Sequence, residues 1–472
     1  MLRCLTILLS LSLLAACTVS HPEIPARYAD TDSLPPLYPD YTEVVLPCNI
    51  SAPNFLVDDP TVTGIVAEVE YQGQRQTFGQ DNKVIFDPND WLNICQSAIG
   101  SDIRITLYTC HDGNNWQRHP SFGITISADS IDPWVAYRLI EPSYVSYDRI
   151  DICRHSLTDG TEQVIVSNDA SRKANSPQCI NCHSFQASNP QNMLYHVRGK
   201  NGGTQLTYNG TTRFLTDLKR QGMISNPVYP AWHPTLPLIA FSTNLTGQLF
   251  HTHGQAKVEV QDTRSHLVLY DIENDQMHCL PADVHQLDCF PTWSPDGTKL
   301  YYTSAHINNP DSIAQQYREV HYDLWTRSFD ADSLCFGEPR LLIDMASEGK
   351  SASLPRVSPD GRFMLYAAGG FGCFHIWHED ADIQLLNLVT MERDSLSEVN
   401  SPRAESYPTW SSNGRWIFLA SRRDDSNYSR IYIAYFDTDG KAHKAFAMPQ
   451  NDPMHDRQLL RSYNRPEPMI AE

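Results

Sequence analysis

The chain has 472 residues, of which 41% are hydrophobic and 10% aromatic, so it can bury a large core and form two domains. The 55 aspartate and glutamate residues outnumber the 36 lysine and arginine residues and give a formal net charge of −19. This balance leaves no basic surface for phosphate contacts and excludes nucleic acid as an expected partner.

The N-terminal segment, MLRCLTILLSLSLLAAC, predicts an export signal. Arg3 precedes an apolar run over residues 5–14, which is too short to stay in a bilayer as a spanning helix. The tetrapeptide LAAC resembles a bacterial lipobox, and this resemblance implies removal of residues 1–16 and acylation of Cys17. An ordinary signal peptide cleaved nearby is the alternative. No acidic residue follows Cys17 directly, which by resemblance to sorted lipoproteins implies an outer-membrane lipoprotein that faces the periplasm and meets the membrane only through its lipid.

Two segments with different patterns follow the signal. Residues 17–46 are rich in proline and polar side chains and lack apolar periodicity, so we expect a linker between the lipid and the folded body. Within residues 47–132, stretches such as TGIVAEVEYQGQ and DIRITLYTC alternate apolar with polar residues, which predicts short antiparallel strands and a small β-sandwich. Its expected role is a spacer or packing module, with ligand binding as the alternative.

A β-strand pattern repeats along the rest of the chain. Each copy has an aromatic residue or leucine, a proline, a bulky residue two positions on, a turn rich in Pro, Asp, Asn or Gly, and then a β-rich run. In every copy the bulky residue precedes the matching apolar residue of the run by seven positions, which indicates a repeat fold. The four pairs are Trp232 and Ile239, Trp293 and Leu300, Val357 and Met364, and Trp410 and Ile417.

A second kind of strand, as in SHLVLYDIEND and SRIYIAYFDTDG, lies between these copies and ends at an Asp or Asn that favours a hairpin turn. One repeat thus has about four antiparallel strands, the content of one β-propeller blade. The SPDG turns within this pattern resemble those of the TolB-like β-propeller family. We therefore expect an all-β protein with a six-bladed propeller over residues 133–450 and a C-terminal tail over residues 451–472.

The sequence NSPQCINCHSF contains Cys179, Cys182 and His183 with the spacing C-x-x-C-H. Aligning CINCHSFQASNPQNMLYHVRG with the blade copies places His183 where other blades have tryptophan, with Met193 ten positions later. Because the usual distance is seven, the turn gains three residues. The first strand of a propeller blade lies nearest the central channel, so we expect the motif at the rim of a rigid scaffold.

This spacing is that of c-type haem attachment, in which two thiols add to the haem vinyl groups and the histidine ligates the iron outside the cytoplasm. Three other interpretations stay open: a Cys179–Cys182 disulfide or redox pair, a metal site that shares His183, and chance. A thioredoxin-like pair would need a βαβ neighbourhood, which the sequence lacks. A structural zinc site would need a second ligand pair, and nothing in the sequence places one nearby.

Over nearly its full length the chain also resembles a group of secreted Bacteroidetes proteins in which a TolB-like propeller carries a C-x-x-C-H-S-F segment, a group often labelled cytochrome-like. The matching segments are CINCHSF, MLYHVRG, YPAWHP, LFHTHGQAKVEV and HLVLYD. This resemblance implies the blade register, whereas the haem that it implies rests on the motif itself.

A haem iron bound by His183 needs a sixth ligand or an open face. Met193 and His196 both lie shortly downstream, and the alternation of a strand places them on opposite faces, so at most one can face the iron. Met193 is the preferred candidate because it corresponds to an inward apolar position of the blade. A core methionine and a surface histidine are the alternative interpretations.

Together these features predict a lipoprotein whose propeller binds an envelope or redox partner and carries one covalent c-type haem for electron transfer or redox sensing. The alternative is a haem-free propeller that acts as an interaction scaffold in an envelope complex. The sequence has no G-x-S-x-G, P-loop or dinucleotide-binding motif, so an enzyme is the less favoured interpretation. A third alternative, an envelope enzyme that acts on glycan, rests only on the versatility of the fold. Of its 12 cysteines, those beyond Cys17 would be exposed to an oxidising compartment, where we expect some to pair.

Overall fold

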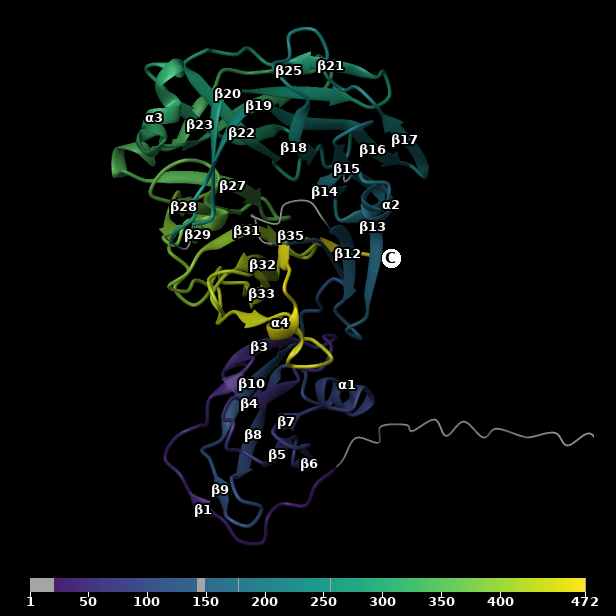
Figure 1. The fold of residues 1–472 in the computed structure, drawn as a ribbon, viewed down its shortest axis with the longest axis vertical. Coiled ribbons are helices and arrows are strands. Elements are labelled where there is room, and N and C mark those ends of the chain that lie inside the picture. Colours follow the sequence, from purple (N-terminus) through teal and green to yellow (C-terminus); the bar gives the residue numbers. More distant parts are fainter. Residues whose placement is uncertain (1–20, 142–148, 177, 255, 472) are drawn as a thin grey trace, which may run out of the picture.

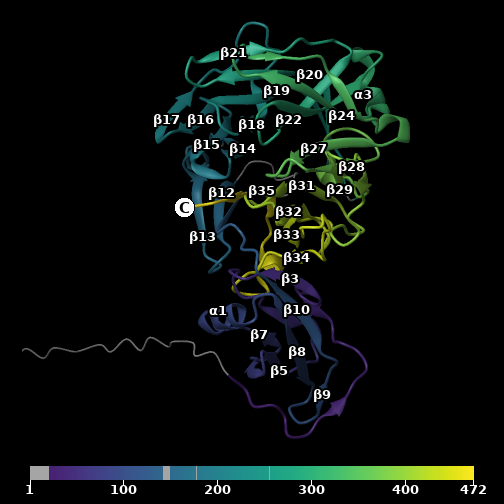
Figure 2. The same cartoon turned by 180° about the vertical axis from the view of Figure 1, so that it is seen from behind.

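The computed structural model describes residues 21–141, 149–176, 178–254 and 256–471. Cys17 and the rest of the expected export signal lie outside these residues. The described chain is an all-β protein with a few short helices, and a smaller N-terminal domain packs against the outer edge of a ring of sheets (Figures 1 and 2). None of the helices in the described part is long and apolar enough to cross a membrane.

The N-terminal domain contains two sheets and one helix. Along its longest strand, Ile103, Ile105 and Leu107 are fully buried at alternate positions, which marks the face that meets the core. Helix α1 (Pro88–Ser97), which the sequence reading did not predict, begins after Asp87, whose carboxylate accepts hydrogen bonds from two backbone N–H groups. The larger sheet contains β1 (Ala29–Asp30), β3 (Val44–Pro47), β5 (Gly64–Tyr71), β6 (Gln74–Phe78), β8 (Ser101–Cys110), β9 (Trp116–Arg118) and β10 (Phe122–Ser127), and the smaller one contains β2 (Leu37–Tyr38), β4 (Phe55–Val57) and β7 (Lys83–Val84).

The described part of the expected linker is not a free spacer. Within residues 21–46, β1 and β3 join the larger sheet and β2 joins the smaller one. Tyr41 is 1% exposed, and its hydroxyl donates a hydrogen bond to the carbonyl of Ala447 in the propeller. The prediction was wrong here because apolar residues such as Tyr41 and Val44 are too sparse to show a period, yet each fills a buried position.

The ring consists of six antiparallel blades, five with four strands and blade four with five, and their inner strands contact one another in ring order. Blades three and four are joined where the long strand β20 reaches β22, with Ser265 opposite Leu287. From the inner strand outward, blade one is β35 (Ser462–Met469), β11 (Trp134–Ile140), β12 (Ile150–Ser156) and β13 (Glu162–Ser167); blade two is β14 (Cys179–Gln186), β15 (Asn189–Arg198), β16 (Gly203–Tyr208) and β17 (Thr211–Leu215); blade three is β18 (Pro227–Trp232), β19 (Leu238–Phe250), β20 (Val258–Asp271) and β21 (Gln276–Cys279). Blade four is β22 (Gln286–Trp293), β23 (Lys299–His306) and β24 (Asp323–Asp330), which pairs with both β25 (Cys335–Phe336) and β26 (Arg340–Ile343); blade five is β27 (Ser351–Val357), β28 (Phe363–Gly369), β29 (Asp382–Asn387) and β30 (Arg393–Asp394); blade six is β31 (Glu405–Trp410), β32 (Trp416–Ser421), β33 (Arg430–Tyr435) and β34 (Phe446–Ala447). The helices of this domain are α2 (Asp169–Lys173), α3 (Ile313–Gln316) and α4 (His455–Gln458), with 3₁₀ turns η2 (Pro310–Ser312), η3 (Tyr317–Glu319), η4 (Ala346–Glu348) and η5 (His375–Trp377).

The last strand of the chain closes the ring. β35 pairs antiparallel with β11 and supplies the inner strand of blade one, although the two strands are more than three hundred residues apart in sequence. The prediction of a C-terminal tail over residues 451–472 was therefore wrong. The segment SYNRPEPM lacks the apolar alternation of a strand because its polar side chains face the interior of the ring, where Asn464 and Glu467 are buried.

The repeated tryptophans are equivalent core residues, as the sequence predicts. Each pairs with the residue seven positions later: Trp232 with Ile239, and Trp293 with Leu300. Each indole N–H also donates to the blade before it; Trp293, for example, donates to the carbonyl of Ala231 at 3.1 Å. The tryptophans therefore join neighbouring blades as well as filling their own.

The SPDG turns, which join the inner strand of a blade to its second strand, form as expected. Asp296 accepts a hydrogen bond from the backbone N–H of Thr298 at 3.0 Å, and Gly297 has a φ of 72°, a conformation that favours glycine. Asp360 and Gly361 repeat this arrangement in the next blade, with a φ of 73° at the glycine.

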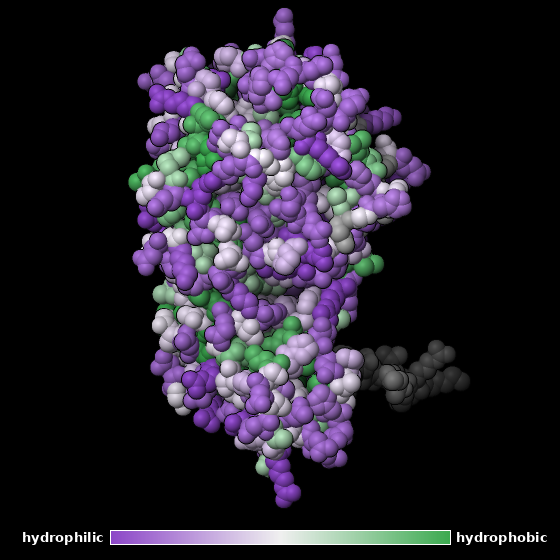
Figure 3. Space-filling view, turned by 90° about the vertical axis from the view of Figure 1, so that its left-hand side faces the viewer, coloured by the Kyte–Doolittle hydropathy of each residue, from purple (hydrophilic) through white to green (hydrophobic). Residues whose placement is uncertain are grey.

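One hydrophobic core extends across the two domains. It combines β8 and α1 of the N-terminal domain with Trp416 and Phe418 of blade six and Tyr463 of the closing strand. The outer surface has a different character: Figure 3 shows a face that is mostly hydrophilic, with apolar side chains in scattered groups. The shared core fixes the N-terminal domain to blade six and to the closing strand β35.

Candidate functional site

Each inner strand of the ring contains a bulge at the same place, and the residue within it has a positive φ. Left-handed backbone at a non-glycine residue is strained, and a bulge re-aims the side chain that it carries. With the prolines that follow them, most of these residues line a small space on the axis of the ring. The six residues are Cys182 (φ 55°), Tyr229 (52°), Phe290 (49°), Leu354 (52°), Tyr407 (49°) and Arg465 (54°).

This alignment corrects the predicted register of the C-x-x-C-H motif. Cys182 is equivalent to Tyr229, so His183 stands where the other blades have proline, and Phe185 takes the tryptophan position. Phe185 pairs with Met193 as tryptophan pairs with its apolar partner elsewhere, which makes the insertion one residue instead of three. The predicted alignment placed His183 at the tryptophan position because this copy lacks the proline that marks the others.

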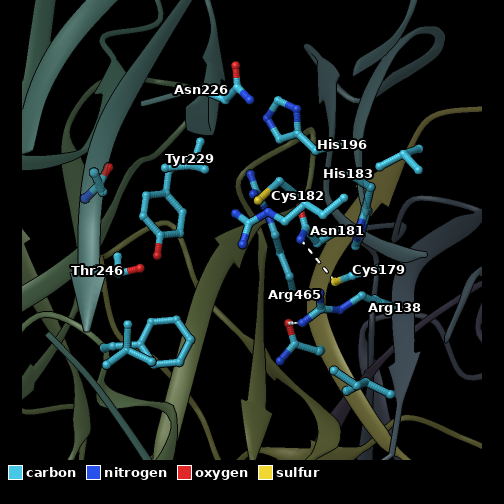
Figure 4. A pocket seen from close by; sticks show the side chains of 18 of the residues that line it. Arg138, Cys179, Asn181, Cys182, His183, His196, Asn226, Tyr229, Thr246 and Arg465 are labelled. Atoms are coloured by element: carbon cyan, nitrogen blue, oxygen red, sulfur yellow. Dashed lines mark hydrogen bonds between the residues drawn. The ribbon is translucent and has the colours of Figure 1, made fainter. Parts of the chain in front are cut away.

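A cavity of about 630 Å³ opens inside the ring beside the motif (Figure 4). Cys179, Cys182 and His183 of β14 all line it, and the size lies within the range usual for small-molecule and cofactor sites. Figure 4 shows Tyr229 of blade three across the cavity from Cys182. The His196 imidazole lies on the same side of the cavity as Cys182. The motif thus lies at a cavity large enough for a cofactor.

Both thiols of the motif are free and partly exposed. The Sγ atom of Cys179 accepts a hydrogen bond from Asn181 Nδ2 at 3.4 Å, and no Cys179–Cys182 disulfide is formed. More generally, the ten cysteines in the described part of the chain are all unpaired, so the expected disulfides are absent there. The thiols remain open to covalent chemistry.

Two buried histidines, His183 and His196, line the cavity. His183 is 1% exposed and His196 is 5% exposed, and burial lowers the pKa of each to about 3, so both are neutral. The Nδ1 atom of His196 is hydrogen-bonded to Thr204 Oγ1 at 2.8 Å. The Nε2 atoms of both rings are buried and have no hydrogen-bond partner among the described residues. A neutral imidazole with a free Nε2 is the form that ligates a metal.

Met193 lies elsewhere. Its side chain packs in the core between blades one and two, together with Ile180, Phe185 and Ile152, and it does not line the cavity. The preference for Met193 over His196 as the residue facing the site was therefore wrong. The prediction that the two residues point to opposite faces was right. Met193 holds the position equivalent to Ile239, but that position belongs to the core between blades, so His196 is the residue that lines the cavity.

The remaining wall combines apolar and cationic groups that the sequence reading missed. Val258, Val260, Ile376 and Trp377 form a hydrophobic cluster along one side. Four arginines, Arg138, Arg198, Arg422 and Arg465, also line the cavity. Arg465 was identifiable from sequence, since RP at residues 465–466 repeats the pattern of YP, FP, LP and YP in the other inner strands. Arg138 and Arg198 lie on blade strands, whereas Arg422 and Trp377 come from segments between strands, and none of these four residues carries a signal in the repeat.

No protein-family model matches the chain, and no curated protein sequence matches it. Among solved structures, TolB from Acinetobacter baumannii is similar with 13% identity over 81% of this chain and 85% of that one, at a TM-score of 0.45. An oligogalacturonate lyase in complex with manganese gives 13% identity over 86% and 99%, at a TM-score of 0.36. A hypothetical selenium-binding protein from Sulfolobus tokodaii gives 8% identity over 87% and 94%, at 0.41. The chain is a β-propeller protein, and this assignment rests on its own strand pairing.

Proposed function

We propose that this protein is a periplasm-facing lipoprotein whose propeller binds a partner and holds one covalent c-type haem in its central cavity, for electron transfer or redox sensing. One observation carries the proposal: Cys179, Cys182 and His183 of a C-x-x-C-H motif all line one cavity of about 630 Å³. The motif alone allowed a chance occurrence. Three motif residues at one cavity support a binding site.

The chemistry of these side chains fits haem attachment. Cys179 and Cys182 are unbridged and partly exposed, as thioether formation with two vinyl groups requires. His183 is neutral at physiological pH and has an unused Nε2 atom. Because that atom is buried, ligation also requires the ring to turn toward the cavity. When bound, the haem supplies a one-electron redox centre.

The walls fit the two halves of a porphyrin. Val258, Ile376 and Trp377 offer an apolar surface that excludes water, as flat hydrophobic cofactors need. Arg138 and Arg465 offer guanidinium groups that can pair with carboxylates such as propionates. Positive charge near a redox centre also favours its reduced form, so these arginines would raise the reduction potential.

The motif thiols are expected to be required for covalent haem. The full chain is produced with its export signal in a host that has c-type maturation machinery, and haem is measured by haem staining after denaturing electrophoresis and by a pyridine haemochrome spectrum. Cys179→Ala/Cys182→Ala should lose the stain completely. The matched control Cys279→Ala/Cys335→Ala removes two exposed thiols elsewhere and should keep it. In the haem-loaded protein, His196→Ala should alter the spin state of the iron spectrum, whereas Met193→Leu should not.

A wild-type protein that leaves this host folded and without haem would overturn the proposal. The haem-free interaction scaffold would then be the better account of the propeller. Equal haem content in the motif variant and the control variant would contradict it as well, because the attachment would then lie elsewhere.

The membrane attachment is tested separately. Cys17→Ser should release the protein into the soluble periplasmic fraction, because the acylated cysteine is the expected anchor. Fractionation and immunoblotting of exported protein provide the measurement, with Cys48→Ser as a control beyond the lipobox. Unchanged membrane association of the Cys17 variant would contradict the lipoprotein assignment.

A further inference from the structure

Away from the motif, three ligand-type side chains from three blades meet in the interior. Asp262 lies on β20 of blade three, Cys289 on β22 of blade four, and Cys373 in the loop that follows β28 of blade five. One carboxylate oxygen and the two sulfur atoms all lie within 4.8 Å of one another. The three residues are 4%, 0% and 4% exposed, respectively. Among the described residues, they form the one such group of potential metal ligands.

The carboxylate of this cluster lacks a positive partner. Asp262 accepts hydrogen bonds from Asn244 Nδ2 at 2.6 Å and from the Cys373 thiol at 3.7 Å, but it forms no ion pair with a described residue. A buried carboxylate without a counter-charge is unfavourable, and a bound cation would supply that charge.

Hydrogen-bond donors around the cluster favour anionic ligands. Asn244 Nδ2 also donates to Cys289 Sγ at 3.4 Å, and Ser242 Oγ lies 3.7 Å from the same sulfur. Donors directed at a sulfur atom stabilise its thiolate form, which is the form that binds metals. The same Asn244 lines the central cavity, so the cluster lies directly behind the cavity wall.

A fourth oxygen is available beside the cluster. Tyr322 is 1% exposed, and its hydroxyl has no hydrogen-bond partner that meets normal geometry among the described residues. Tyr322 packs in the same buried cluster as Cys289 and Cys373. An unsatisfied buried hydroxyl is costly and points to a missing partner.

We propose that Asp262, Cys289 and Cys373 bind one zinc ion, with Tyr322 or a water molecule in the fourth position. Two thiolates and one carboxylate are ligands that zinc accepts in four-coordinate structural sites, and thiolates select against calcium and magnesium. Both thiols release their protons on binding. The ion joins blades three, four and five, and it leaves Asp262 with a counter-charge.

A Cys289–Cys373 disulfide is the competing product. Its formation transfers two electrons and two protons from the thiols to an external oxidising disulfide. It would leave Asp262 buried without a cation and Tyr322 without a partner, and these two observations favour the metal.

The test uses the full chain with the Cys179→Ala/Cys182→Ala change, so that neither haem iron nor the motif thiols contribute to the metal count. Protein reconstituted with Zn²⁺ is freed of excess metal, and zinc is counted by mass spectrometry. One zinc ion per chain is expected. A further Cys289→Ser/Cys373→Ser change should remove it, whereas the control Cys279→Ser/Cys335→Ser, at two exposed thiols, should not. Chelation should lower the Tm of the parent protein and of the Cys279→Ser/Cys335→Ser control, but not that of the Cys289→Ser/Cys373→Ser variant.

A second measurement uses Co²⁺ in place of zinc and does not require the Cys289→Ser/Cys373→Ser variant to fold. The parent protein loaded with Co²⁺ should show thiolate-to-cobalt charge-transfer absorption and the strong visible bands of a tetrahedral site. A cobalt spectrum without thiolate bands would overturn the proposal. A Cys289–Cys373 disulfide found by non-reducing peptide mapping of zinc-exposed protein would also overturn it. Because the parent protein cannot attach haem, these outcomes are independent of the haem proposal.

Discussion

Glu467→Ala is expected to lower the free energy of unfolding by about 3–5 kcal/mol, because it leaves two partly buried guanidinium groups, on side chains 30% and 11% exposed, without their counter-charge. Glu467 lies on β35, is 8% exposed, and accepts a hydrogen bond from Arg465 Nε at 2.9 Å. It is also hydrogen-bonded to Arg356 of blade five. Since blades one and five are not neighbours, the carboxylate connects strands on either side of blade six. Urea denaturation followed by circular dichroism measures the change.

The pH dependence of this contribution has a definite sign. Burial alone would raise the pKa of Glu467, but Arg356 and Arg465 outweigh burial and hold the pKa below its ordinary value. The stabilisation is therefore fully present above the pKa of the unfolded state and is lost as the pH falls through the lower pKa of the folded state.

An exposed ion pair provides the matched control. Arg393 and Glu348 are in contact at 2.7 Å, with side chains 37% and 38% exposed. Glu348→Ala removes the same carboxylate in solvent, where such pairs contribute about 0.2–1 kcal/mol. Equal losses in the two variants would contradict the role given to the buried network.

Trp293→Ala is expected to cost about 3–5 kcal/mol, as truncations of large aromatic side chains in cores do. The indole is 6% exposed, packs edge-on against Phe329 with ring centroids 5.0 Å apart, and donates a hydrogen bond to the preceding blade. Val389 is 74% exposed and serves as the control: Val389→Ala should change the free energy of unfolding by no more than about 0.5 kcal/mol. A loss at Trp293 no larger than at Val389 would mean that the blades do not depend on the repeated tryptophan.

Much of the fold was predictable because the repeat is local. Trp232, Trp293 and Trp410 lie one hairpin away from their partners, so a fixed spacing of seven appears in the sequence and becomes a cross-strand pair in the sheet. The propeller, its all-β class and its six blades follow from this regularity.

The closing strand and the site were harder to predict. The pairing of β35 with β11 depends on contacts between the two ends of the domain, which no local pattern encodes. The motif residues were identified by their chemistry, but the exact register at His183 depended on the bulge at Cys182, which no local pattern in this copy marks. Trp377 and Arg422 reach the cavity from segments outside the repeat, so only the folded chain brings them to the motif.

Closure of the ring by the final strand also sets an order of events during biogenesis. A chain exported N-terminus first delivers β14 long before residues 462–469 arrive, and β14 contacts β35 in the finished ring. Until then blade one lacks its inner strand, and the neighbouring edge of β14 stays accessible. Under the proposed function, enzymes that attach haem to Cys179 and Cys182 would have this interval in which to act on an open chain. Arrival of the C-terminal strand would end the interval and enclose the haem.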